Sequence, residues 1–357
     1  VQAPLAEGVP ARAIFHDWVY LISRAGVIKS HWPLEDPSLA GAPLQYHYFL
    51  MVHAAAASWV TGVEVSTVLL RLVHLPLAAA LAAQVFLLGR AAARTPWGGV
   101  AAGGLFLATS ELSFSTGYGD SQFLGLFSRW LFVSPTFHFG LIYAGALLLV
   151  LGEALRARAF RPRAGLLVLL LGVGGTGAKG TVLPAIVAAL CLLALWGWWR
   201  SRRLPGNALI AAGLSLAAFA AVYVPAMSAW RTGEARLNPF HIFELTGFWK
   251  QWQPVCESAL RGLLPDSFAT AGSRLLCGLV AFAGTAGVRL LALPFLAWPA
   301  AWPADRGLIR LLGAFLAACV GMGLLLELNS HGEIYVLLMM RLPMAVLAAG
   351  FLVAASR

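Results

Sequence analysis

Residues 164–198 read AGLLVLLLGVGGTGAKGTVLPAIVAALCLLALWGW, an apolar stretch whose one charged residue is Lys179. A helix needs about 20 apolar residues to cross a bilayer core, so the stretch is too long for one crossing. The cluster GGTGAKG at 174–180 interrupts it, and glycine-rich clusters break helices. The stretch therefore predicts two membrane-spanning helices joined by a tight turn.

Further apolar runs lie on both sides of this stretch. They cover 66–89, 97–110, 136–153, 207–226, 274–297, 307–327 and 334–355. Together with the 164–198 pair they predict about nine spans. The chain is 60% hydrophobic and only 11% charged, as polytopic membrane proteins are. The predicted fold is all-α, a single transmembrane helical bundle over residues 1–357.

The charged residues between the runs sort into two alternating sets of segments. Arginines cluster at 90–94, 156–163, 200–203 and 306–310, together with the acidic residues Glu153 and Asp305. The other thirteen of the fifteen acidic residues fall in 1–65, 111–135, 227–273 and 327–333. The positive-inside rule places the arginines in the cytoplasm and the acidic segments on the extracytoplasmic side. The richness in Ala, Leu, Gly and Arg favours a bacterial source, for which that side would be the periplasmic side of the inner membrane. An N-terminus on that side predicts one more helix upstream of Val1.

Two of the outer segments have the character of interfacial structure. Residues 43–61 are apolar enough for a tenth span, but Tyr46, His47 and Tyr48 favour a helix lying in the outer interface, where amphipathic rings are stable. Residues 227–273 have aromatic and amphipathic character, which fits either a pair of interfacial helices or a lid over a lipid-facing cavity. We expect outer-face interfacial helices within 1–65 and 227–273.

The formal net charge of +10 does not indicate a nucleic-acid partner. Many arginines sit near predicted helix ends on the cytoplasmic side, where anionic lipid headgroups attract them. No basic stripe interleaved with aromatic residues, no zinc-ligand spacing and no nucleotide-binding glycine motif accompanies them. The predicted partners are therefore membrane lipids.

The first outer segment holds the densest set of groups that could do chemistry. Its stretch 16–47 contains three carboxylates and three histidines: Asp17, Glu35, Asp36, His16, His31 and His47. Carboxylates near a membrane surface can bind a divalent cation such as Mg²⁺ or Mn²⁺, act as a base toward a hydroxyl, or cap a helix. For Glu35 and Asp36, which precede Pro37, turn chemistry is the simpler interpretation. Asp17 is the stronger catalytic candidate.

The second outer segment, 111–135, adds two acidic candidates. Asp120 follows the flexible pair Gly117 and Gly119, so it could contribute a second carboxylate to a site. A solvated loop aspartate is the competing interpretation. Glu111 directly follows a predicted span and fits either a substrate contact or an anchor at the helix end.

Two of the cations inside apolar stretches are candidate site residues. Lys179 is one of three lysines in the chain, and a charge at such a depth usually marks a site that faces protein or water. It fits a phosphate-binding lysine or a lysine in a solvated turn. Arg341, inside the last predicted span below His331 and Glu333, fits either a substrate-binding cation or a buried pair with a carboxylate.

These features together resemble the C-type (GT-C) membrane glycosyltransferases, in particular bacterial members related to the arabinose and mannose transferases. The segment from Trp32 to Tyr48 resembles the first outer loop of that group, and Ser66–Gly89 with Arg71 resembles the helix that follows it. Ala178-Lys179-Gly180 is similar to a lysine-bearing helix break in related bacterial proteins.

The resemblance implies a helical bundle with a cavity open to the outer leaflet. It implies transfer of a sugar from a polyprenyl-phosphate donor to an acceptor on the outer side, in cell-envelope synthesis. Asp17 matches the first-loop acid that acts as base or positions the acceptor, and Asp120 or Glu111 matches the second-loop acid. Lys179 and Arg341 would hold the donor phosphate. His16, His47 and His331 are further candidate substrate contacts.

Two other functions remain open from the sequence. A non-catalytic membrane subunit could use the same scaffold to bind lipid or a partner complex. A transporter should place ionisable residues at mid-membrane in several spans, and Arg71, His74, Arg289 and Arg341 are the candidates. Since no buried acidic partner is predicted within the spans, cation-coupled transport is the weakest hypothesis.

Overall fold

The computed structural model describes residues 16–31, 33–39, 41–109, 134–227, 235–302, 306–328 and 332–356. Within these ranges seven helices are long and apolar enough to cross a membrane. They are Val65–Ala93, Pro135–Arg156, Val182–Ser201, Gly206–Ala226, Asp266–Ala297, Gly307–Leu325 and Gly332–Ala355. The predicted all-α, multi-pass membrane architecture is confirmed. Two further predicted spans correspond to shorter helices, α5 (Pro96–Leu107) and α8 (Pro162–Ala178).

Several spans are built from more than one helical segment. The full order is α1 (His16–Ser30), α2 (Phe49–Thr61), α3 (Val65–Thr67), the π-helix η2 (Val68–Leu72), α4 (His74–Ala93), α5 (Pro96–Leu107), α7 (Pro135–Arg156), α8 (Pro162–Ala178), α9 (Val182–Ser201), α10 (Gly206–Met227), β1 (Arg236–Leu237), η3 (His241–Leu245), α11 (Gly247–Arg261), α12 (Asp266–Ala286), η4 (Gly287–Leu291), α13 (Ala292–Ala297), η5 (Pro299–Ala301), α14 (Gly307–Leu325), β2 (Leu326–Glu327), α15 (Gly332–Met339) and α16 (Arg341–Ala355).

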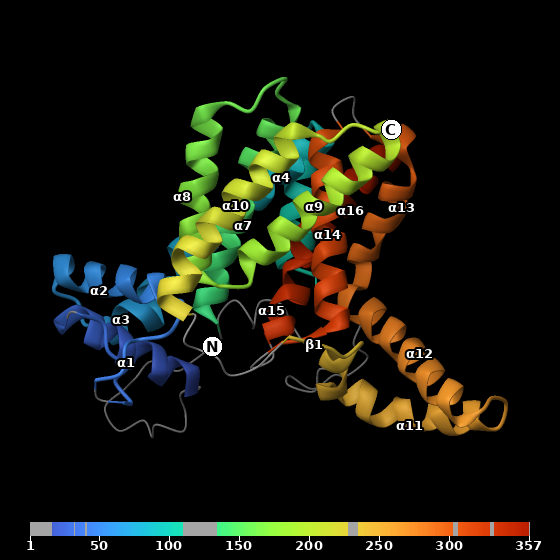
Figure 1. Cartoon of the computed structure of the whole chain (residues 1–357), viewed down its shortest axis with the longest axis horizontal. Helices are drawn as coiled ribbons and strands as arrows, with labels where there is room; N and C mark the ends of the chain where they lie inside the picture. The colour runs from blue at the N-terminus through green and yellow to red at the C-terminus, as the bar shows by residue number, and fades with distance from the viewer. Residues whose placement is uncertain are drawn as a thin grey trace.

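The last span forms the centre of the bundle. Most of the α15–α16 window is buried, more than in the other candidate spans. α16 packs against α4, α5, α13 and α14 (Figure 1). A helix that is apolar on all sides is stable only when protein or lipid surrounds it, and here protein does.

The predicted break in the 164–198 stretch is confirmed, but it is shorter than predicted. α8 continues through Ala178, so only residues 179–181 separate it from α9. The glycines before Lys179 are helical and serve packing. A Cβ on Gly174 would overlap the Tyr143 ring, and a Cβ on Gly177 would overlap the Phe49 ring. The prediction missed this because glycine signals a turn and a close helix contact equally well.

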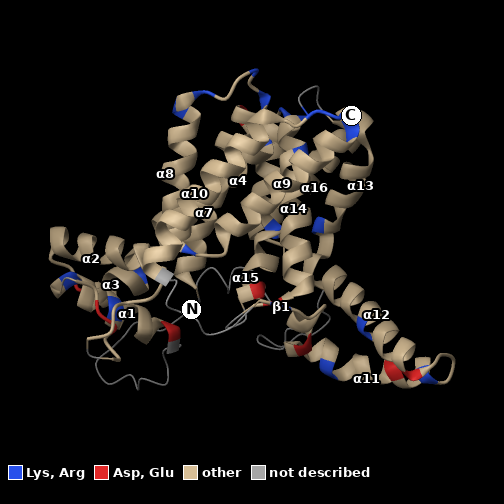
Figure 2. Cartoon of the chain, in the orientation of Figure 1, with Lys and Arg blue, Asp and Glu red and all other residues tan. Residues whose placement is uncertain are grey.

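Charged side chains gather at the two ends of the bundle, as Figure 2 shows. Lysine and arginine side chains crowd the end formed by the α4–α5, α7–α8 and α9–α10 connections, which we call the basic end. Acidic side chains on α1, α11, α12 and α15 lie at the opposite, acidic end. The separation of acidic from basic segments, predicted from the loops, is therefore also present in the folded bundle.

The segment 43–61 does not cross the bundle. Its helix α2 has 13 residues, which gives a length of about 20 Å against a hydrocarbon core of about 30 Å. α2 packs against α1, and both lie across the direction of the spans at the acidic end (Figure 1). These features agree with the interfacial interpretation rather than with a tenth span.

The described part of the segment 227–273 also lies at the acidic end. Its α11 forms a hairpin with the first turns of α12 and projects from the bundle (Figure 1). β1 pairs antiparallel with β2, with Arg236 opposite Glu327, which ties this segment to the end of α14. α12 then continues into the bundle, so the span predicted at 274–297 begins earlier, at Asp266.

Candidate functional site

Three helix N-termini converge on one pocket at the acidic end. Ser134 and Thr136 at the start of α7, Gly180 and Thr181 before α9, and Gly332 at the start of α15 all line a cavity of about 820 Å³. The first N–H groups of a helix have no intrahelical acceptor and carry partial positive charge. Neither Ser134 nor Thr181 caps its helix with a side-chain hydrogen bond. The pocket therefore favours an anion.

Lys179 adds a full positive charge to this convergence. It occupies the turn between α8 and α9 and is only 6% exposed. Its Nζ lies 3.5 Å from the centre of the Tyr335 ring, within cation–π range. Burial lowers the pKa of Lys179 to about 7, although the nearby Asp17 carboxylate raises it in part. A bound anion would restore the charged form, because an opposite charge raises a lysine pKa.

The position of Lys179 depends on Gly140 in α7. A Cβ on Gly140 would lie 2.7 Å from the Lys179 Cβ. Gly140→Ala is expected to push the turn away and to cost roughly 1–3 kcal/mol, as overpacking does. Gly103→Ala is the matched control, because a Cβ there meets nothing within 4 Å. Thermal unfolding in detergent should show a lower midpoint for Gly140→Ala alone; equal midpoints would contradict the tight contact.

The opposite wall of the pocket comes from α1 and from the loop that follows it. Asp17, Tyr20 and Leu21 line the cavity from one face of α1, at the spacing of adjacent helical turns. His47, only 8% exposed, approaches from the loop, and its Nε2 makes no hydrogen bond within the described residues. Burial, together with Lys179 and Arg24, holds the pKa of His47 well below 6.5. His47 is therefore neutral at physiological pH.

Hydroxyl groups connect the two walls. The Tyr46 hydroxyl is hydrogen-bonded to Thr136, and the Tyr335 hydroxyl to Ser134. Ser134 Oγ and Thr136 Oγ1 lie 3.4 Å apart. Burial raises the pKa of Tyr46, so its hydroxyl stays protonated and can serve as a donor. These groups line the polar part of the pocket, where an anion or a sugar could find donors.

The far part of the same pocket is apolar. Phe219 and Tyr223 line it from α10, with their rings stacked 4.8 Å apart, and Pro184 and Met322 add to it from α9 and α14. Tyr223 is 38% exposed on the outside of the bundle. The pocket thus joins a cationic, hydroxyl-rich end to an apolar wall, and this shape matches an amphiphile with an anionic head.

Glu35 and Asp36 do not line the pocket. Asp36 Oδ2 accepts a hydrogen bond of 2.7 Å from Arg24 Nη2, and Asp36 Oδ1 accepts one of 2.8 Å from the Ser38 backbone N–H. Glu35 Oε1 lies 3.5 Å from His31 Nε2, and both side chains are exposed. The expectation that these carboxylates belong to the catalytic group finds no support in their placement, whereas turn chemistry accounts for Asp36.

The Arg24–Asp36 pair predicts an acid-sensitive contribution to stability. Partial burial alone would raise the pKa of Asp36, but the bonds from Ser38 and Arg24 outweigh it and lower the pKa. A lowered carboxyl pKa stabilises the fold above the unfolded value of about 3.9, and that stabilisation is lost as the pH falls through the folded pKa. Asp36→Asn should therefore cost about 1–3 kcal/mol at neutral pH and less in acid.

The neighbouring Glu35→Gln variant is the control for this prediction, because its carboxylate is 40% exposed. Exposed pairs contribute about 0–1 kcal/mol, so this change should leave the midpoint of thermal unfolding nearly unchanged. Midpoints measured at neutral and acidic pH compare the two variants directly. An Asp36→Asn midpoint equal to that of the parent chain would rule out a stabilising role for the pair.

Arg341 and Glu333 sit in the bundle core and not in the pocket. Arg341 begins α16 and is fully buried. Glu333 is also fully buried in the first turn of α15, where Oε1 lies 3.2 Å from His241 Nδ1 and Oε2 accepts the Leu328 N–H. The inference that the spans contain no buried acidic side chain is therefore wrong, and solvent does not explain Glu333. The prediction missed it by assigning residue 333 to a loop.

Three predicted site residues, Glu111, Asp120 and His331, lie outside the described residues. His16 begins α1, but its side chain is not described. The structure thus brings Asp17, His47 and Lys179 together, out of the predicted set. Sequence reasoning missed the hydroxyls of Tyr46, Thr181 and Tyr335. Ser134-Pro135 and Thr181 do carry the signature of helix starts, which is the signal that could have found this end of the pocket.

Within the described ranges, no three His, Cys, Asp or Glu side chains form a group that could hold a metal ion. A divalent cation such as Mg²⁺ or Mn²⁺ bound by the first-segment carboxylates stays a prediction. Comparison of the chain with protein-family models, with curated proteins and with solved structures finds no match.

Proposed function

We propose that this chain is a membrane glycosyltransferase that transfers a sugar from a polyprenyl-phosphate donor to an acceptor hydroxyl on the extracytoplasmic face of a bacterial inner membrane. One observation carries the proposal: Asp17 and Lys179 line the same amphiphilic pocket at the acidic end of the bundle. A carboxylate and a cation in one lipid-accessible pocket provide the two charges that such a transfer requires.

The donor would fit the pocket head first. Its phosphate would lie between Lys179 and the N-termini of α7 and α9, where the ammonium and the helix dipoles favour negative charge. Its polyprenyl chain would leave along Phe219 and Met322 toward the lipid. The hydroxyls of Tyr46 and Thr136 would face the sugar.

The transfer itself forms one bond and breaks one. The acceptor oxygen attacks the anomeric carbon of the sugar, and the bond from that carbon to the phosphate oxygen breaks. The acceptor proton passes to the Asp17 carboxylate, which acts as general base. The bonding electrons leave with the polyprenyl phosphate, and Lys179 stabilises the charge that develops there.

Donor binding should weaken as the pH rises through about 7, where burial places the pKa of Lys179. A glycosyl phosphodiester keeps one negative charge over this range, and His47 stays neutral because its pKa is lowered. Above pH 7 the dissociation constant should rise by up to about tenfold per pH unit, since the ammonium must first take up a proton. Titrations between about pH 6 and pH 9 measure this slope. This dependence of the dissociation constant on pH should vanish in Lys179→Met. If it is unchanged in that variant, a group other than Lys179 causes it.

Reconstituted activity tests the function directly. The chain in proteoliposomes should convert polyprenyl-phosphate arabinose or mannose and a saccharide acceptor into glycosylated acceptor and free polyprenyl phosphate. Stoichiometric release of both products would support the proposal. Tight donor binding without turnover, together with a co-purifying membrane protein, would point to a lipid-binding subunit instead. Uptake of free solute would point to a transporter.

A further inference from the structure

A second cavity lies at the basic end, far from the pocket of Asp17 and Lys179. It measures about 660 Å³ and is enclosed by α9, by α13 with η5, and by the first half of α14. We propose that it binds an anionic phospholipid, with the phosphate of the headgroup held by arginines and an acyl chain in the apolar part. The two pockets lie at opposite ends of the bundle, so this inference does not depend on the proposed glycosyl transfer.

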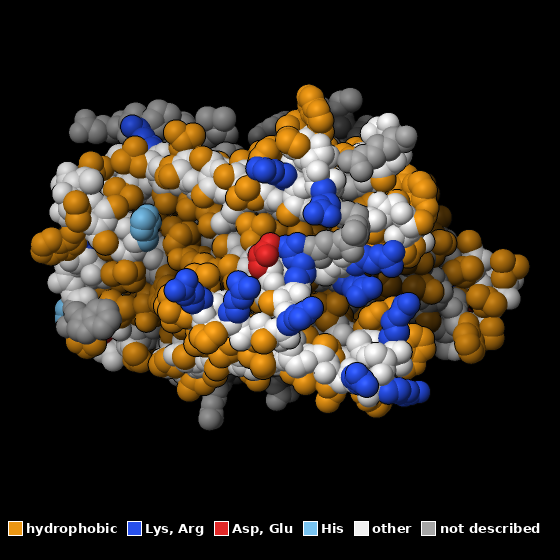
Figure 3. All heavy atoms as spheres, turned by 90° about the horizontal axis from the view of Figure 1, so that it is seen from above, with side chains coloured by type: hydrophobic (Ala, Val, Ile, Leu, Met, Phe, Trp, Pro, Cys, Tyr) orange, Lys and Arg blue, Asp and Glu red, His pale blue; other side chains and the backbone are white. Residues whose placement is uncertain are grey.

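Three arginines line this cavity. Arg306 and Arg310 are one helical turn apart at the start of α14, and Arg200 lies in the last turn of α9. All three are exposed, and within the described residues their guanidinium groups make no hydrogen bond or ion pair. Figure 3, which looks onto this end, shows basic side chains interspersed with apolar ones. The planar guanidinium group of arginine suits phosphate, because it can donate two parallel hydrogen bonds to the phosphate oxygens.

The rest of the cavity is apolar and shaped by small residues. Gly313, Ala314 and Ala317 follow Arg310 along one face of α14. Gly313 packs closely against Leu296, and the short side chains of Ala314 and Ala317 leave room beside the helix. Leu192 and Trp196 face that space from α9. The arginines stand at the end of the groove and the small residues lie along it, so a ligand must be charged at one end and apolar along its length.

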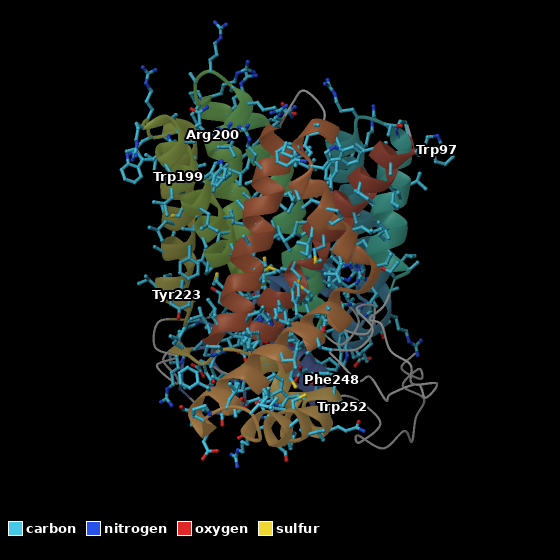
Figure 4. All side chains as sticks on the ribbon, turned by 90° about the vertical axis from the view of Figure 1, so that its right-hand side faces the viewer. Trp97, Trp199, Arg200, Tyr223, Phe248 and Trp252 are labelled. Atoms are coloured by element: carbon cyan, nitrogen blue, oxygen red, sulfur yellow. The ribbon has the colours of Figure 1, made fainter. Side chains whose placement is uncertain are left out.

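The arginines lie at the height along the bundle where lipid headgroups are expected. Figure 4 shows Arg200 at the same end as Trp97 and Trp199, whereas Tyr223, Phe248 and Trp252 lie toward the opposite end. Trp97 and Trp199 are 74% and 64% exposed. Exposed tryptophans near the end of a span mark the interface between hydrocarbon and headgroups. The guanidinium groups are therefore placed where phospholipid phosphates lie, and basic pockets between helices bind anionic headgroups.

Other occupants leave part of the cavity unexplained. A free phosphate or a nucleotide would neutralise the arginines but leave the groove of Leu192, Trp196 and Ala314 unfilled. A neutral lipid would fill the groove but leave the three arginines without an anion among the described residues. An anionic phospholipid satisfies both parts.

The test compares lipid binding by the purified full-length chain, measured by native mass spectrometry. Phosphatidylglycerol should bind at least roughly tenfold more tightly than phosphatidylcholine with the same chains, because the arginines act on net charge. Arg200→Gln/Arg306→Gln/Arg310→Gln should lose that preference. The matched control Arg90→Gln/Arg158→Gln/Arg163→Gln removes as many charges from the same end, outside the cavity, and should keep it. Equal losses in both triple variants would overturn the site in favour of general surface charge.

Two further measurements distinguish binding of the lipid headgroup from binding of the acyl chain. Glycerol phosphate, which lacks acyl chains, should not displace bound phosphatidylglycerol; displacement at comparable concentration would make this a free-phosphate site and overturn the proposal. Ala314→Leu/Ala317→Leu fills the groove and keeps all three arginines. It should weaken phosphatidylglycerol binding severalfold, and unchanged binding would show that no chain occupies the groove. The competition arm uses the parent chain and stays informative if a triple variant fails to fold.

Discussion

Lys179→Met is expected to lower the rate of sugar transfer by about 10²–10³-fold, the usual effect of removing one group that stabilises a developing anion. Lys179 is the cation in the described part of the acidic-end pocket, and its ammonium stands where three helix N-termini converge. Methionine fills a similar volume without charge, so packing against Tyr335 and Gly140 should survive. Donor affinity and turnover should both fall, because the donor phosphate carries charge before and during the reaction.

Lys250→Met is the matched control, since Lys250 is an exposed lysine on α11 and does not line the pocket. It should transfer sugar at the rate of the parent chain. Turnover and donor affinity are measured in the same proteoliposomes for both variants. If Lys179→Met keeps full turnover while remaining folded, the phosphate does not bind at the α8–α9 turn.

Asp17→Asn is expected to abolish transfer while leaving donor binding close to that of the parent chain. General-base catalysis contributes about 10²–10⁴-fold, and an amide cannot accept the acceptor proton. Removing the negative charge of Asp17 relieves its repulsion of the phosphate but also lowers the pKa of Lys179, so the two effects oppose each other and donor binding should change little. This combination, lost turnover with intact binding, distinguishes a base from a residue that only supports the pocket.

Asp266→Asn provides the control for this second prediction. Asp266 is an exposed carboxylate at the start of α12, at the same end of the bundle but outside the pocket. Its change should affect neither binding nor turnover. Full turnover in Asp17→Asn would reassign the base to another group, and Asp120 and Glu111, outside the described residues, would then be the next candidates to replace.

The bundle could be predicted because its signals are local. Long apolar runs and alternating charged loops identify spans one at a time, and the break near Lys179 was visible as a glycine cluster. The limits of that break were not, because Gly174 and Gly177 serve contacts with Tyr143 and Phe49 that are distant in sequence. The same limit applies to Glu333, whose burial depends on His241, contributed by a different element.

The candidate site could be predicted only in part, for the same reason. Asp17, His47 and Lys179 each stood out as ionisable groups in apolar surroundings. Nothing in the sequence indicated that α1 and the start of α9 would line the same pocket, or that Tyr46 and Tyr335 would bond to the start of α7. Asp36 shows the converse: it is a carboxylate of the same outer segment as Asp17, and its pair with Arg24 holds it outside the pocket.

A structure of the chain with a bound polyprenyl-phosphate sugar would test the central claim most directly. The phosphate should lie within hydrogen-bond distance, about 3 Å, of Lys179 Nζ. The anomeric carbon should face Asp17, and the polyprenyl chain should run past Phe219. Donor density elsewhere, or a donor in this pocket with its phosphate remote from Lys179 and its sugar remote from Asp17, would contradict the assignment.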